Sequence, residues 1–61
     1  MNKEVKRIRL AAHLVQGEFA KLLGVSTHTV SMWECGKFGV SIRNQRKIID
    51  FCNKYGIDAE V

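Results

Sequence analysis

Apolar residues recur along this chain at intervals of three and four positions, the spacing that places side chains on one face of an α-helix. The first two segments with this spacing carry Val5, Ile8 and Ala12 and then Phe19, Ala20 and Leu23. Gly24 follows the second segment directly, and glycine suits the residue after a helix. No run of residues alternates apolar and polar side chains between turn residues, so the pattern predicts helices and no strands.

Polar residues mark where the helices should begin. Asn2 can cap the first helix, because its side chain can accept hydrogen bonds from free backbone N–H groups. Ser26 and Ser41 precede two further helical segments, residues 27–35 and a longer one that ends before Gly56. The sequence therefore predicts an all-α protein, a compact bundle of four or five short helices, in which the fifth would be at most one further turn in the tail.

The segment 27–35 has two unlike sides. At about 100° per residue, Val30 and Trp33 fall on one side and are expected to point into the core. The opposite side carries His28, Ser31, Met32 and Cys35. The full predicted core consists of Val5, Ile8, Leu14, Phe19, Ala20, Leu23, Val25, Val30, Trp33, Ile42, Ile48 and Cys52.

The second and third segments are joined by only three residues, Gly24 to Ser26, and so short a link makes two helices cross steeply, as in a helix-turn-helix. The stretch QGEFAKLLGVSTHTVSMWECGK, residues 16–37, resembles the helix-turn-helix of the phage repressor and Cro family, also called the xenobiotic-response-element type. The matching positions are Ala20, Gly24, Val30, Trp33 and the ending WECGK. The resemblance implies a lambda-repressor-like domain over residues 1–61, with the helix-turn-helix itself at residues 16–35.

The resemblance also implies roles for exposed residues, because the third helix of this family lies in the DNA major groove and reads base edges near its N-terminus. Base readout would come from Thr27, His28 and Met32, and contacts to base or phosphate from Thr29 and Ser31. Gln16 and Lys37 would contact the DNA backbone. Arg43 forms a basic patch with Arg46 and Lys47, which is either a solvated face or a surface that contacts the DNA backbone or a partner.

Four residues bear on the stability of such a domain. Family members with this spacing pair the residues at Arg9 and Glu34, which ties the first helix to the end of the third, and the same buried pair is expected here. His13 stands where a glycine often ends the first helix. Val15 stands where a serine or threonine usually caps the second, so two helix ends lack their usual residues.

The charge of the chain favours a polyanionic partner. Ten Lys and Arg face six Asp and Glu, a formal net charge of +4. Asp58 and Glu60 lie in the tail, so residues 1–57 carry ten basic and four acidic groups, or +6. This balance suits nucleic acid or an anionic membrane surface, although a plain basic surface would give the same count.

Catalysis is not expected. Cys35 and Cys52 are too few for a disulfide framework, and with His13 and His28 they do not form metal-ligand spacing. No nucleophile–base pair and no phosphate-binding glycine loop is present, so neither a cofactor nor a small-molecule substrate is expected. The sequence lacks a signal peptide and a membrane-spanning run, which indicates a cytoplasmic protein with reduced thiols and no membrane partner.

Two functions follow from these patterns. The first is a sequence-specific transcription regulator, a Cro-like repressor of phage or prokaryotic type, that binds double-stranded DNA as a homodimer on a two-fold operator. Its dimer surface would lie on the fourth helix and tail, near Phe51, Tyr55 and Ile57. The alternative is an antitoxin-like or other protein-interaction module that uses the fourth helix and also binds DNA. RNA binding is disfavoured, because exposed aromatic residues for base stacking are lacking.

Overall fold

The computed structural model describes residues 1–59 and contains four helices: α1 (Asn2–Ala11), α2 (Gln16–Leu23), α3 (Thr27–Cys35) and α4 (Ile42–Tyr55). No strand is formed among the described residues, and the predicted all-α fold is confirmed. Residues 57–59 have no regular structure, so they do not form the further turn considered for the tail. Residues 60 and 61 of that tail lie outside the described part of the chain.

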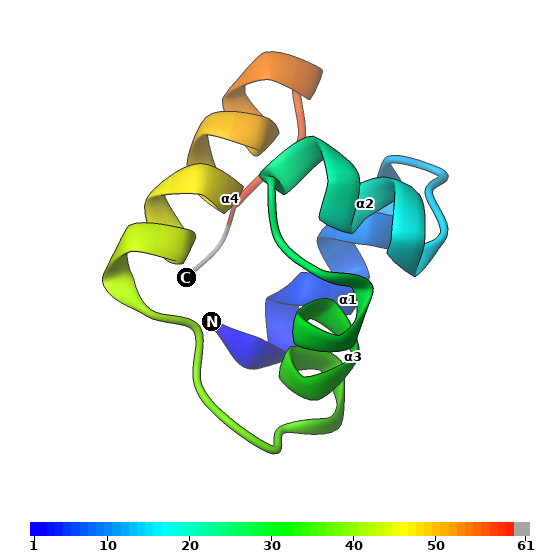
Figure 1. Ribbon diagram of the computed structural model, residues 1–61. Helices are drawn as coiled ribbons and strands as arrows, with labels where there is room; N and C mark the ends of the chain where they lie inside the picture. The colour runs from blue at the N-terminus through cyan, green and yellow to red at the C-terminus, as the bar shows by residue number, and fades with distance from the viewer. Residues whose placement is uncertain (60–61) are drawn as a thin grey trace.

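The helices form two groups around the core. Figure 1 shows α4 along one side of the molecule and α1, α2 and α3 on the other. Helix α3 packs against both α1 and α2, and α4 packs against α2. Phe19 of α2 meets Phe51 of α4 edge to face, with ring centroids 5.1 Å apart. Edge-to-face pairs are favourable because the positive edge of one ring lies against the negative face of the other.

The residues after the helices explain how the chain turns so sharply. Gly24 after α2 and Gly36 after α3 have φ of 74° and 73°, a left-handed conformation that is strained for residues with a Cβ. The Val25 N–H after this turn donates to the Ala20 carbonyl at 3.0 Å, which satisfies a free carbonyl of the helix end. Helix α1 ends with the same geometry, but there the left-handed residue is His13, with φ of 58°. This end of α1 therefore keeps backbone strain that glycine would remove.

Helices α3 and α4 begin with the predicted serine caps. Ser26 Oγ accepts a hydrogen bond from the Thr29 N–H at 3.0 Å, and Ser41 Oγ accepts one from the Asn44 N–H at 3.2 Å. Each bond satisfies one of the backbone donors that a helix leaves free in its first turn.

Helices α1 and α2 begin differently. The prediction that Asn2 caps α1 is wrong, because the helix begins at Asn2 and the residue before it, Met1, provides no side-chain cap. The Asn2 side chain instead donates to the loop after α3. At the start of α2, Val15 has no side-chain acceptor, and the Glu18 carboxylate accepts a hydrogen bond from the Val15 N–H at 3.1 Å. This bond is one half of a capping box, and it holds the start of α2 without a serine or threonine.

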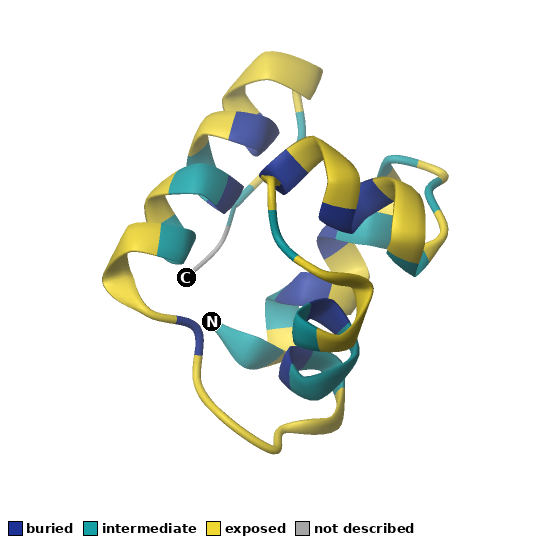
Figure 2. Ribbon diagram, viewed as in Figure 1, coloured by how far each residue is buried: buried dark blue, intermediate teal, exposed yellow. Residues whose placement is uncertain are grey.

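Most of the predicted core is present, as Figure 2 shows by the buried segments that face the centre. The buried apolar residues are Val5, Ile8, Phe19, Ala20, Leu23, Val30, Trp33, Val40, Ile48, Phe51 and Cys52. Leu14 and Val25, both predicted as core, are only partly buried and pack against this cluster.

The predicted burial of Ile42 is wrong, since its side chain is 70% exposed. At about 100° per residue, Ile42 lies about 120° around α4 from the fully buried Ile48, so it points to solvent. Val40, just before the helix, is 7% exposed and takes the place in the core. Phe51, expected on a dimer surface, is 6% exposed and belongs to the core as well.

Candidate nucleic-acid interface

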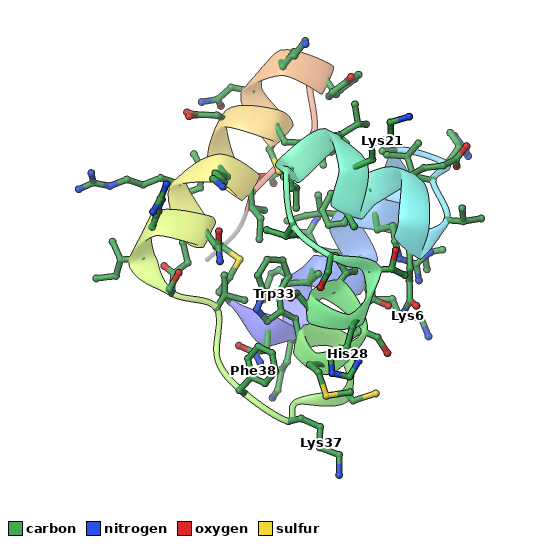
Figure 3. The ribbon with its side chains drawn as sticks, viewed as in Figure 1. Lys6, Lys21, His28, Trp33, Lys37 and Phe38 are labelled. Carbon is green, nitrogen blue, oxygen red and sulfur yellow. The ribbon has the colours of Figure 1, made fainter. Side chains whose placement is uncertain are left out.

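Helix α3 is held to the core by one side and open to solvent on the other. Val30 is 0% exposed and Trp33 is 1% exposed. Thr27 and His28 are exposed, whereas Met32 is half-buried and less open than its place on the helix predicts. Figure 3 shows Trp33 directed into the molecule and His28 on the outer side of α3. The first turn of α3 is therefore the part of the helix most accessible to a DNA groove.

The starts of α2 and α3 lie side by side. A Cβ atom built on Gly17, in the first turn of α2, would lie 3.6 Å from Thr27 Oγ1. Thr29 is half-buried, and its hydroxyl shares a hydrogen bond of 2.8 Å with Ser26 Oγ. Ser31 is half-buried too. Thr27 is thus open on the surface that α2 and α3 share, while the Thr29 hydroxyl is already engaged at the helix start.

A partly buried polar network connects α1, α2 and α3. Arg9 Nε donates to Glu34 Oε2 at 2.8 Å, and Arg9 Nη2 donates to Glu34 Oε1 at 3.0 Å. These side chains are 11% and 6% exposed, so the pair expected from the sequence is present and largely buried. Arg9 Nη1 also donates to the Leu14 carbonyl at 2.9 Å, and Gln16 Nε2 donates to Glu34 Oε1 at 3.1 Å. The two parallel bonds of the arginine fix both the distance and the orientation of the carboxylate.

The network favours the charged forms of both partners. The hydrogen bond to Glu34 raises the pKa of Arg9, and the negative charge of Glu34 adds to this against the effect of burial. Burial raises the pKa of Glu34, but hydrogen bonds from Arg9 and Gln16 and the charges of Arg9 and Lys6 outweigh it and leave the pKa below its ordinary value. An ionised carboxylate only accepts hydrogen bonds, so the amide nitrogen of Gln16 must face Glu34. That nitrogen carries a second N–H, which can donate to another acceptor.

Two further predicted contact residues lie after α3. Lys37 is exposed in the loop between α3 and α4, and Figure 3 shows it with His28 toward the same side of the molecule. Arg43 is exposed in the first turn of α4. Within residues 1–59, neither side chain forms a hydrogen bond or an ion pair. Both cations are therefore open to an anionic partner, and Lys37 is the one that extends the α3 surface.

Two residues near this surface were not identified from the sequence. Lys6 is exposed on α1, and its charge helps to lower the pKa of Glu34. Asn2 contacts the loop that carries Lys37, through its bond to the Phe38 carbonyl. The sequence contains a weak signal for Lys6, namely its positive charge. It contains none for Asn2, because its acceptors are backbone groups far along the chain.

The described residues offer no other obvious chemistry. Among residues 1–59, no group of three or more His, Cys, Asp or Glu side chains could hold a metal ion. None of the helices in this range is long and apolar enough to cross a membrane. Cys35 is an exposed free thiol and Cys52 a buried one, and burial raises the pKa of Cys52.

Helices α2 and α3 are joined by a turn of only three residues. Val30 and Trp33 fix α3 to the core, and the first turn of α3 stays open. This arrangement is a helix-turn-helix of the DNA-binding class. A family model described as helix-turn-helix matches residues 5–58. The chain therefore belongs to this helix-turn-helix family, of the Cro/C1 type, whose members bind DNA and are typically non-catalytic. No curated protein and no solved structure matches the chain.

Proposed function

We propose that the protein is a sequence-specific transcription regulator, a Cro-like repressor whose residues 1–61 act as one domain that reads the DNA major groove with α3. The observation that carries this proposal is the two-sided α3, with Trp33 buried behind the exposed Thr27 and His28. A rigid helix with an open first turn is what base readout requires. The formal charge of +4 adds a general attraction to phosphate.

The proposed contacts separate into readout and anchoring. His28 can donate to a base acceptor such as guanine N7, and the open part of Met32 can cover a thymine methyl. Thr27 lies beside the start of α2 and would read the neighbouring base, with Thr29 and Ser31 as secondary contacts to base or phosphate. Lys37, Gln16 and Arg43 would bind phosphates, which fix the register of the helix without reading sequence.

The test begins with selection of bound DNA from a random pool. On the selected site His28→Ala should lose about 1–3 kcal/mol of binding free energy and relax the preference at one base pair. Lys37→Ala should weaken binding to selected and scrambled DNA alike. It should also make the salt slope, the change of log affinity with log salt concentration, shallower by about one. Equal losses of His28→Ala on both DNAs would show that His28 does not read a base.

Lys21→Ala is the matched control for the lysine variant. Lys21 is exposed on α2, and Figure 3 shows it at the opposite end of the molecule from Lys37. The Lys21→Ala variant loses the same charge away from the proposed interface, so its salt slope should stay close to that of the wild type. If both lysine variants change the slope equally, the binding surface is diffuse and Lys37 is not a specific anchor.

The proposed two-fold dimer would use the groove between α2 and α4. Its lining consists of Leu22, Leu23, Lys47, Asp50, Phe51, Lys54 and Tyr55. Leu22 is 53% exposed and Tyr55 is 48% exposed, so these two side chains supply exposed apolar surface in the groove, whereas Phe51 in its lining is only 6% exposed. One recognition helix covers few base pairs, and pairing two helices places the half-sites about one turn of DNA apart.

A charge placed in the groove tests the dimer. Leu22→Glu should lower affinity for a two-half site while leaving binding to a single half-site near the wild-type value. Leu10→Glu is a matched control, because Leu10 is also 53% exposed but lies on α1. A selected site with one unrepeated half would contradict the dimer. The alternative, an antitoxin-like module, would use the same groove to bind a different protein. A stable complex of this chain with that protein and DNA would favour the alternative.

A further inference from the structure

The side chain of Asn2 links the start of α1 to the loop that follows α3. Its amide nitrogen donates to the Phe38 carbonyl at 2.7 Å and lies 3.4 Å from the Trp33 carbonyl. Trp33 belongs to the last turn of α3, where helix carbonyls lack partners within the helix. The two acceptors are 31 and 36 residues away in sequence, so this one side chain joins three parts of the chain.

The loop contacted by Asn2 has few other restraints. Residues 36–39 are all exposed, and the segment contains two glycines, whose backbones lose the most freedom on ordering. The Gly36 and Lys37 N–H groups bond back to α3, to the carbonyls of Trp33 and Met32. Beyond them, the Asn2 bond is the one hydrogen bond that residues 38 and 39 make within the described part of the chain.

Asn2 itself is well anchored. The side chain of Met1 before it is 3% exposed and packs against the core. Val5 and Ile8, on the same helix, are fully buried. The amide of Asn2 therefore projects from an anchored helix end toward a loop whose four residues, 36–39, are all exposed. An amide suits the position because it can donate to the Phe38 carbonyl, which makes no other hydrogen bond within residues 1–59, and a carboxylate could not donate.

We propose that Asn2 is a positioning residue for DNA binding, which holds residues 36–39, and Lys37 with them, in the conformation that contacts phosphate. This inference rests on the Lys37 contact proposed above. Without the Asn2 bond the loop is free to sample other conformations, and DNA must then order it on binding. The conformational entropy lost at that step weakens the complex without changing any residue that touches DNA.

The experiment compares Asn2→Ala with Asn53→Ala, a matched change at an exposed position of α4 that makes no side-chain hydrogen bond within residues 1–59. Amide relaxation measured by NMR in the free protein should show faster motion at residues 37–39 only in Asn2→Ala. Binding to selected and scrambled duplexes should weaken by about five- to tenfold for Asn2→Ala, and hardly at all for Asn53→Ala.

Combination with Lys37→Ala separates positioning from general stability. If Asn2 acts through Lys37, Asn2→Ala should cost less than about twofold in affinity once Lys37 is alanine. The positioning role would be overturned if the affinity losses of the two variants simply add, or if the motion at residues 37–39 is unchanged in Asn2→Ala. Either result would leave the proposed function intact. No loss of affinity in Lys37→Ala alone would instead overturn the phosphate contact, and the positioning role with it.

A second variant covers the case in which Asn2→Ala folds poorly. Asn2→Asp keeps the shape of the side chain, and a carboxylate suits the first turn of a helix. It lacks the donor, so the NMR measurement should again show a mobile loop. A rigid loop in Asn2→Asp would contradict the proposal. Its added charge acts on DNA affinity directly, so this variant is used for the NMR measurement alone.

Discussion

Residues 2–35 and residues 36–59 share one core, but their polar side chains are fixed in different ways. In the first region Arg9, Glu34 and Gln16 form a network that spans three helices. In the second, the side-chain hydrogen bonds are local: Ser41 Oγ accepts one from the Asn44 N–H, and the Gln45 amide donates one to the Val40 carbonyl. Within residues 1–59, the bond of Asn2 to Phe38 is the one side-chain hydrogen bond that crosses between the regions.

The difference indicates that one kind of interaction orients the helices and another holds α4 to the rest of the domain. Apolar contacts such as Phe19 against Phe51 hold α4 to the rest, but hydrophobic contact has little directional preference. Hydrogen bonds with defined geometry fix the directions of α1, α2 and α3, which carry most of the proposed DNA-binding surface. The orientation of α3 should therefore depend on its polar network, and α4 should tolerate change on its outer face.

The largest effect is expected at the centre of the first region. Trp33→Ala should cost roughly 3–5 kcal/mol of unfolding free energy, because it leaves a large cavity beneath α3. A domain of this size has about 3–9 kcal/mol in total, at about 0.05–0.15 kcal/mol per residue, so the variant should lose at least about a third of its stability and its urea midpoint should fall sharply. The matched change Tyr55→Ala, at a half-exposed ring of α4, should cost much less. Similar urea midpoints for the two variants would contradict the comparison.

The next effect concerns the buried network and its dependence on pH. Glu34→Gln should cost roughly 3 kcal/mol at neutral pH, because it leaves the Arg9 charge without its partner. The folded-state pKa of Glu34 lies below its ordinary value of 4.5, so the stabilisation is complete above about pH 4.5 and is lost as the pH falls through the folded-state pKa. Melting curves from pH 7 to pH 3 should therefore show the wild type approaching the variant on acidification.

Asp50→Asn, an exposed change on α4, is the control for that experiment. It should stay close to the wild type across the same range. A constant gap between wild type and Glu34→Gln at all pH values would show that the ionised carboxylate is not what stabilises α3.

A smaller effect should separate two neighbouring apolar residues of the second region. Val40→Ala removes buried carbons and should cost about 1.5–2 kcal/mol, from about 0.8 kcal/mol for each carbon plus a small cavity. Ile42→Ala removes more carbon atoms but from a side chain that is 70% exposed, so it should stay within about 0.5 kcal/mol of the wild type. Chemical denaturation of both variants measures the difference, and a larger loss for Ile42→Ala would place that side chain in the core.

The smallest effect is a gain in stability at the end of α1. His13→Gly should stabilise the protein by about 0.5–1 kcal/mol, because glycine adopts a positive φ without the strain caused by a Cβ. His13→Ala keeps the Cβ and should bring no such gain. Thermal melts of the two variants check this, and equal midpoints would mean that φ at this position is not under strain.

The sequence predicted well those features that depend on local patterns. Helix positions followed from apolar spacing, the starts of α3 and α4 from Ser26 and Ser41, and the sharp turn from Gly24, since each depends on a few neighbouring residues. The pairing of Arg9 with Glu34 was accessible only through family resemblance, because the partners are 25 residues apart. The readout and anchoring roles at α3 stay predictions, although the structure leaves Thr27, His28 and Lys37 exposed.

Tertiary packing decided what local patterns left open. An isoleucine at position 42 and a valine at position 40 look equally apolar in the sequence, but the register of α4 against α2 turns one outward and leaves the other to fill the core. Asn2 looks like a helix cap, yet in the fold its amide meets the Phe38 carbonyl, because packing brings the start of α1 beside the loop after α3. Such contacts join residues far apart in the chain, so they depend on how whole helices pack together, which a local pattern does not specify.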